Sequence, residues 1–281
     1  MFKLFNKYRL SASLALLLLS IMSSPLTAEE ECYCPCESNR FYIGGFGGGI
    51  YSNSTKLSQT GVAFFPEDTI GPLAVDARGH TRKKSSGYGG AQIGYEWSQN
   101  PIQIGCSNWN ITPAAELEAY YYSHKRRGSL INITGGLDEH DFIVSFPMDM
   151  GIYMVNGVLN LNSCCLGKFT PYVGGGVGVA DICIRKAKSF QISPPEPGIN
   201  HFDSRRSDSA WAFAAQAKAG LRYNIFNCFH IFAEYRFLFL DTSTYTFGST
   251  IAPGHVPTTT WGVRVNHVCY NAFAFGIQFD L

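Results

Sequence analysis

NAFAFGIQFDL, residues 271–281, places an apolar side chain at every second position. The apolar positions are Phe273, Phe275, Ile277, Phe279 and Leu281. Successive side chains of a β-strand point to opposite sides, so a period of two is typical of a strand with one apolar face. The stretch therefore predicts a β-strand that turns one face toward an apolar environment.

Strand-like patterns recur along the rest of the chain, which predicts a β-rich fold. Long polar or proline-rich tracts alternate with shorter connections that carry turn residues such as Asn100 and Pro101. Long loops at one end and short turns at the other are expected of a transmembrane barrel. The further predicted strands are 41–51, 86–97, 111–122, 141–155, 169–182, 210–223 and 228–240.

The beginning of the chain has the pattern of an export signal. Basic residues precede an apolar stretch at 14–22, and small residues end at Ala28. The apolar stretch is shorter than the ~20 residues of a spanning helix, so we predict a cleaved signal peptide at 1–28. We expect a cysteine-rich periplasmic segment at 29–40 and one barrel domain at 41–281.

The composition excludes a helical membrane protein. The chain is 46% hydrophobic and 15% charged, and no run after the predicted signal is long enough to span a membrane as a helix. A chain that crosses a membrane without such helices has to cross as a closed barrel. The 29 glycines and the 14% aromatic content suit a barrel wall with aromatic girdles. The sequence predicts an all-β, eight-stranded antiparallel transmembrane β-barrel, and nothing in it indicates nucleic-acid binding.

Charged side chains within the predicted strands lie opposite the aromatic ones. A soluble barrel with its aromatic face inside would show the same alternation, but small residues such as Ala212 and Gly176 fill the polar face, which suits a narrow lumen. In strand 141–155 this rule turns the apolar row from Phe142 to Ile152 outward and Asp149 inward. Buried charges need partners, so we predict an ion-pair network formed by Glu116, Glu118, Lys218, Arg222, Glu234 and Arg236.

Two functions of this network are open. It could plug the lumen, or it could line a small pore with charge. Eight strands leave an interior just wide enough for side chains. This dimension favours the plug.

Four segments carry a family resemblance. PYVGGGVG (171–178), AAQAKAGLRYNI (214–225), FAEYRF (232–237) and AFGIQFDL (274–281) resemble the last four strands of small bacterial outer-membrane β-barrels, the family that includes the membrane domain of outer membrane protein A. The resemblance implies an outer-membrane location. It also implies that the terminal strand is the signal read by the barrel-assembly machinery, with Leu281 where that signal normally ends in Phe.

Basic residues cluster in the long connections, near the outer rim of the predicted barrel. Arginine and lysine at this level can neutralise the phosphates of lipopolysaccharide, although ordinary solvated loops have the same composition. An adhesive role toward a host surface ligand is compatible with either. The rim residues are Arg82, Lys83, Lys84, Lys125, Arg126, Arg127, Arg185, Lys186 and Lys188.

Nine cysteines are unusual for an exported chain and favour disulfides in the oxidising envelope. Those at the periplasmic end could link the barrel to itself or to envelope proteins. The spacing in CYCPC lacks the usual two-residue gap, so no metal site is predicted there. The disulfide candidates are Cys32, Cys34, Cys36, Cys106, Cys164, Cys165 and Cys228.

No catalytic set can be assembled from the sequence. His124, His140, His201 and His255 lie on predicted loops, where histidines are common, and we predict no catalytic residue and no cofactor. The sequence favours a non-enzymatic outer-membrane barrel with a structural and adhesin-like role through its long loops. A small porin-like channel is the alternative, and a rim hydrolase is a third.

Overall fold

A computed structural model describes residues 38–68, 71–105, 109–135, 140–226 and 228–281. The predicted signal peptide and most of the cysteine-rich segment lie outside these residues. The regular structure of the described part is almost wholly β, with one short 3-10 helix, η2 (Cys164–Leu166). No helix there is long and apolar enough to cross a membrane.

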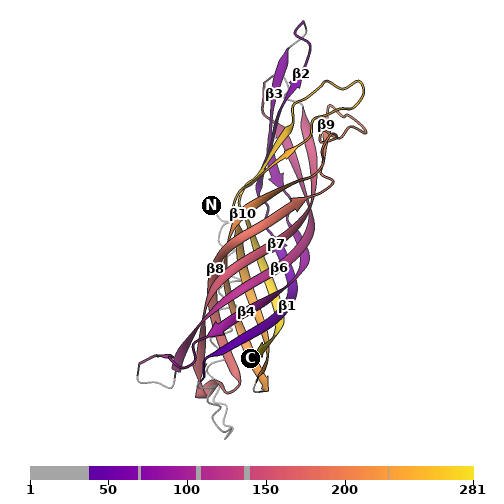
Figure 1. Cartoon of the computed structure of the whole chain (residues 1–281). Coiled ribbons are helices and arrows are strands. Elements are labelled where there is room, and N and C mark those ends of the chain that lie inside the picture. Colours follow the sequence, from indigo (N-terminus) through magenta and orange to yellow (C-terminus); the bar gives the residue numbers. More distant parts are fainter. Residues whose placement is uncertain (1–37, 69–70, 106–108, 136–139, 227) are drawn as a thin grey trace, which may run out of the picture. The chain divides into compact units, whose positions relative to one another are not determined.

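Eight strands close an antiparallel barrel (Figure 1). Each pairs with its neighbour, and the last pairs with the first, where Tyr42 lies opposite Asp280. Closure leaves no free edge in the wall, and it confirms the predicted fold class. The strands in order around the ring are β1 (Arg40–Ser52), β4 (Lys84–Glu96), β6 (Trp109–Asn132), β7 (Asp141–Ser163), β8 (Phe169–Ile184), β10 (Asp208–Phe226), β11 (Phe229–Leu240) and β14 (Val268–Asp280).

The long connections are more ordered than the sequence indicates. Figure 1 shows extra strands beyond one end of the barrel. They pair with one another and with the upper halves of β6 and β7. In β6 this half, residues 123–132, is strand where a loop is predicted, whereas in β7 it falls within the predicted strand 141–155. We call residues 53–83, 123–149, 185–209 and 241–267 the head. Its strands, besides the upper halves of β6 and β7, are β2 (Lys56–Phe64), β3 (Pro72–Thr81), β9 (Lys188–Ser193), β12 (Ser243–Phe247) and β13 (Trp261–Val265); β5 (Ile102–Gln103) lies at the other end.

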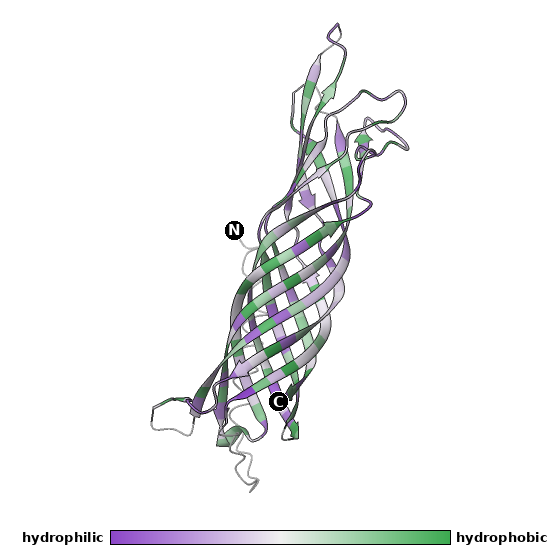
Figure 2. Cartoon of the chain, viewed as in Figure 1, coloured by the Kyte–Doolittle hydropathy of each residue, from purple (hydrophilic) through white to green (hydrophobic). Residues whose placement is uncertain are grey.

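An apolar belt covers the outside of the barrel. Leu117 is 57% exposed, Trp211 65% and Phe275 70%. Figure 2 shows hydrophobic and hydrophilic residues alternating along the strands. A wall with aromatics outside and charges inside is the arrangement that lipid requires, so the soluble inside-out barrel is wrong. The alternating residues of the last strand all face outward: Phe273, Phe275, Ile277, Phe279 and Leu281.

The upper half of β7 overturns one prediction. Its apolar row from Phe142 to Ile152 is buried inside, not turned outward, and Asp149 faces outward, where it accepts a hydrogen bond from the Tyr121 hydroxyl (2.9 Å). Most of this row, from Phe142 to Met148, lies in the head, which has an apolar core of its own, and Met150 and Ile152 continue the same inward phase into the barrel. Alternation separates two faces of a strand, but it does not say which face is inside.

Glycines opposite aromatic rings allow the lumen to close, and Gly220 provides a test. A Cβ at Gly220 would lie 2.5 Å from Cζ of Tyr172, its partner on β8. Gly220→Val is therefore expected to destabilise the barrel by about 1–3 kcal/mol in urea unfolding. Gly157→Val is the matched control, because a Cβ there meets nothing within 4 Å. Equal effects of the two changes would contradict this account of the packing.

Candidate functional site

Five charged residues meet in the middle of the lumen. Lys218 on β10 contacts Glu116 and lies 2.6 Å from Oε1 of Glu118, both on β6. Arg236 lies beside Lys218 in the β10–β11 register; it pairs with Glu118 at 3.1 Å and also contacts Glu234. We call these five residues the central network. All are at most 5% exposed, and each has a direct partner of opposite charge inside the barrel.

Neutral side chains complete the hydrogen bonding of the central network. Carboxylates have several acceptor sites, and donors to them stabilise a buried carboxylate. Arg236 also stacks on an aromatic face, with its guanidinium carbon 4.0 Å from the Phe46 ring centre. The donors are the hydroxyl of Tyr42 to Glu116 (2.6 Å), the hydroxyl of Tyr172 to Glu234 (2.9 Å) and Nε2 of Gln216 to Glu118 (2.6 Å).

Arg222 belongs to a second group, nearer the turn end of the barrel. It pairs with Glu96 at 3.0 Å, and Arg40 bridges Glu96 (2.8 Å) and Asp280 (2.7 Å). His230 adds a further contact to Asp280 at 2.8 Å. Of these, only Arg222 is among the predicted lumen residues. The signal for Glu96 was available, because it continues the period of two from Gln92 and Gly94.

The two groups together fill the lumen. Every charged side chain in them is at most 12% exposed. The side chains come from facing walls of the barrel and meet in the middle. Eight strands leave an interior just wide enough for side chains, and here paired charged side chains occupy it.

The prediction that Arg126 lies on the outer rim is wrong. Arg126 is 1% exposed and donates hydrogen bonds to Oγ1 of Thr81 (3.1 Å) and the hydroxyl of Tyr270 (3.0 Å). It points inward because it shares the inward phase of β6 with Glu116 and Glu118. The remaining predicted rim residues are exposed: Arg82, Lys83, Lys84, Lys125, Arg127, Arg185, Lys186 and Lys188.

Three of the described cysteines lie at the end of the barrel where short turns connect the strands. Cys164 and Cys165 lie in η2, between β7 and β8, and Cys228 lies at the turn between β10 and β11. Among the described cysteines, Cys165, Cys228, Cys183 and Cys269 form no disulfide. The other disulfide candidates, Cys32, Cys34, Cys36 and Cys106, lie outside the described residues.

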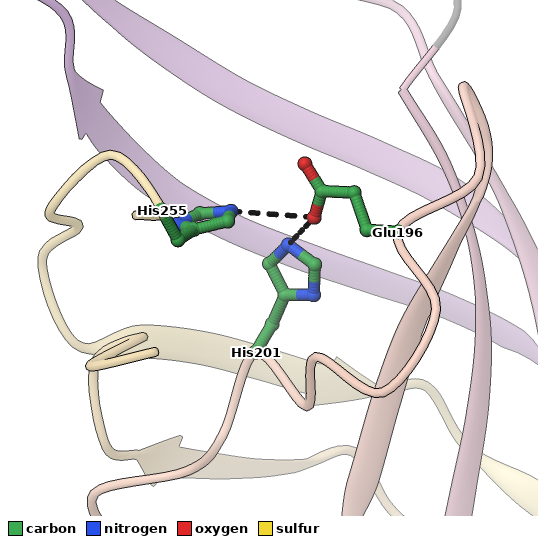
Figure 3. Close-up of side chains that lie close together, drawn as sticks. All are labelled: Glu196, His201 and His255. Atoms are coloured by element: carbon green, nitrogen blue, oxygen red, sulfur yellow. Dashed lines mark ion pairs between the residues drawn. The ribbon is translucent and has the colours of Figure 1, made fainter. Parts of the chain in front are cut away.

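Two loops of the head bring together groups that the sequence keeps apart. Glu196 and His201 come from the connection after β9, and His255 comes from the connection between β12 and β13. Figure 3 shows both rings pointing at the Glu196 carboxylate; each Nε2 lies 3.3 Å from its Oε2. Burial lowers the pKa of His201 to about 4, so this ring is neutral at neutral pH. We call Glu196, His201 and His255 the head triad.

The head triad lies in a cavity of about 210 Å³. Aromatic rings form part of the wall: Phe142 lies 5.1 Å and Trp261 5.7 Å from His201, both edge to face. The sequence places His201 and His255 on predicted loops, and no local spacing marks them as ligands, because two different loops supply the triad. Carboxylate and imidazole groups converging in a cavity could hold a metal ion.

Comparisons with known proteins give matches among solved structures alone. No protein-family model matches the chain, and no curated protein matches it. Among solved structures, the outer membrane protein OprG from Pseudomonas aeruginosa is 13% identical, with 86% of this chain and 97% of that chain covered and a TM-score of 0.37. Neisserial surface protein A is 10% identical, with 85% and 96% covered and a TM-score of 0.33. The outer membrane protease OmpT from Escherichia coli is 8% identical, with 90% and 99% covered and a TM-score of 0.39.

The wall and its faces identify the kind of protein. The ring of β1, β4, β6, β7, β8, β10, β11 and β14 closes through the pairing of β14 with β1. Its outside is apolar, and its inside is charged and packed. The chain is therefore an eight-stranded antiparallel β-barrel of the outer-membrane type, as its last four strands implied.

Proposed function

We propose that this protein is a non-enzymatic barrel of the bacterial outer membrane that carries the head at the cell surface for adhesin-like interactions. Export by the predicted signal peptide and recognition of β14 by the barrel-assembly machinery belong to the same proposal. The apolar belt supports the membrane location. The filled lumen favours an anchor over the alternative, a small porin-like channel.

The length of β6 is the observation that carries the proposal. Its outward residues are apolar as far as Tyr121 and then turn polar, with Ser123, Lys125 and Arg127 following. A tilted strand spans the bilayer with about 9–11 residues, whereas β6 has 24 and its partner β7 has 23. About half of this strand pair therefore continues beyond the lipid.

The head has a packed interior, which suits a recognition surface. Phe146 from β7 stacks on Phe247 at 5.8 Å between ring centres, and Phe202 lies 4.5 Å from Phe247. All three rings are 0% exposed. A core of this kind fixes the loops around it, and a partner loses less free energy in binding a surface that is already ordered.

The exposed basic side chains provide a second site of interaction with the envelope. Lys125 on β6 lies opposite Pro147 on β7. The carbonyl of Pro147 accepts a hydrogen bond from the backbone N–H of Arg185 (3.1 Å), so Lys125 and Arg185 lie at the same height along the barrel wall. This level lies just beyond the apolar belt, where the phosphates of lipopolysaccharide would meet the protein. Charge-assisted contacts with phosphate are the strong class of hydrogen bond.

Removing three of these charges tests the rim contact. In the variant Lys125→Gln, Arg127→Gln, Arg185→Gln, binding to lipopolysaccharide is expected to weaken at least about tenfold. Lys168→Gln is the control, because Lys168 is an exposed base at the other end of the barrel. Binding is measured with detergent-solubilised protein against intact and dephosphorylated lipopolysaccharide. Equal affinity for the two lipids would contradict the rim contact and leave the head as the interaction surface.

A further inference from the structure

Hydrogen bonds behind the head triad fix the orientation of both histidines. Nδ1 of His201 lies 3.2 Å from the carbonyl oxygen of Ser189, and Nδ1 of His255 lies 2.6 Å from that of Val256. A carbonyl oxygen only accepts, so the proton sits on Nδ1 of each ring. A ring that carries its single proton on Nδ1 presents the lone pair of Nε2 to Glu196. Metal-binding histidines are oriented by the same kind of backbone contact.

The third atom of the cluster is also an acceptor. Oε2 of Glu196 is buried and has no hydrogen-bond donor among the described residues. Three acceptors therefore face one another, 3.3 Å apart along two edges. A buried acceptor without a donor is costly, and a cation between the three atoms removes that cost. Protonation of one ring at Nε2 would also supply a donor to Glu196. Charge-assisted N–H···O bonds are normally about 2.7–2.9 Å long, however, shorter than the 3.3 Å found here.

The spacing fits a small metal ion. Tetrahedral Zn²⁺ binds nitrogen and carboxylate oxygen at about 2.0–2.2 Å, which places neighbouring ligand atoms about 3.3–3.5 Å apart. The two histidine–carboxylate distances are 3.3 Å, and all three ligand atoms lie within 4.8 Å of one another. Ca²⁺ and Mg²⁺ prefer oxygen ligands, whereas two imidazoles favour a transition metal.

We propose that Glu196, His201 and His255 bind a divalent transition metal ion, Zn²⁺ by preference, in the head. The three protein ligands leave a fourth position toward the 210 Å³ cavity, where water or an exogenous ligand can bind. The ion would also tie the loop after β9 to the loop before β13. The site rests on the geometry of the head and is independent of the rim contact.

Metal titration of the whole chain tests the site. The refolded protein carries no histidine tag, and it is stripped of metal and titrated with Co²⁺ and then Zn²⁺. Glu196→Gln removes the charged ligand at constant size, and His255→Asn removes one imidazole that is only 12% exposed. His267→Asn is the control, because this ring packs on Phe239 and lies outside the triad. Thiolate ligation by the cysteines adds a near-ultraviolet band to the Co²⁺ spectrum, which histidine and carboxylate ligands do not give.

One tetrahedral Co²⁺ per chain without the thiolate band, displaced by Zn²⁺, is the expected result. Each triad variant is expected to bind at least about 100-fold more weakly, and the control is expected to bind like the wild type. No binding by the folded wild type, or unchanged binding by Glu196→Gln, would overturn the proposal. If the variants fail to fold, limited proteolysis of the wild type decides: Zn²⁺ must protect segment 248–260, and equal cleavage with and without Zn²⁺ overturns the site.

Discussion

Lys218→Met is expected to lower the free energy of unfolding by about 3–5 kcal/mol. The ammonium of Lys218 is the cation shared by Glu116 and Glu118, and neither carboxylate is more than 5% exposed. Without it, the carboxylate of Glu116 keeps the hydroxyl of Tyr42 as a hydrogen-bond donor but loses its cationic partner. Methionine preserves the volume, so the loss reports the charge and not a cavity. Urea unfolding of the refolded barrel in detergent or lipid measures it.

Two comparisons separate the network from a general effect of removing a lysine. Lys125→Met changes an exposed lysine on the outside of the same barrel and is expected to cost almost nothing. Adding Glu116→Gln to Lys218→Met is expected to recover part of the loss, because it removes the unpaired charge. If Lys218→Met were no more costly than Lys125→Met, the central network would not stabilise the barrel.

A double variant, Lys218→Ala with Glu234→Ala, is expected to open the lumen to ions. It removes one charge of each sign from the middle of the barrel, together with the side-chain volume that fills it. Tyr172 also loses the carboxylate that its hydroxyl contacts. Planar-bilayer recordings are expected to show discrete conductance steps for this variant.

The control for this experiment lies on the outer wall. Lys125→Ala with Asp149→Ala also removes one charge of each sign, but outside the lumen, so its recordings are expected to match those of the wild type. A double lumen variant that is folded and silent would mean that the remaining side chains close the barrel without the central network. Different gel mobility before and after boiling shows that each variant is folded.

The barrel wall could be predicted because alternation is a local property. In β10 and β11 the charges and the aromatics occupy opposite faces, and lipid outside decides which face is which. Lys218 and Arg236 followed directly from that rule. The rule fails in the head, where no lipid is present: the apolar row that begins at Phe142 is buried inside instead of facing outward.

The head triad could not be predicted, for a different reason. Glu196 and His201 share one loop, and His255 comes from another that is distant in the sequence. Their meeting depends on how these loops pack over Phe142 and Trp261, which no spacing in the sequence encodes. The signal for Asp280 lies in the sequence, because it continues the polar phase of the last strand between Phe279 and Leu281, whereas Arg40 lies just before the predicted strand 41–51.

Single-channel conductance of the refolded wild-type protein tests the central claim most directly. The claim is that the barrel is a closed anchor and that interactions take place on the head and its rim. A folded wild-type barrel that passes no current in a planar bilayer is the predicted result. Discrete and reproducible conductance steps from the wild type would contradict it and make the lumen charges the selectivity residues of a pore.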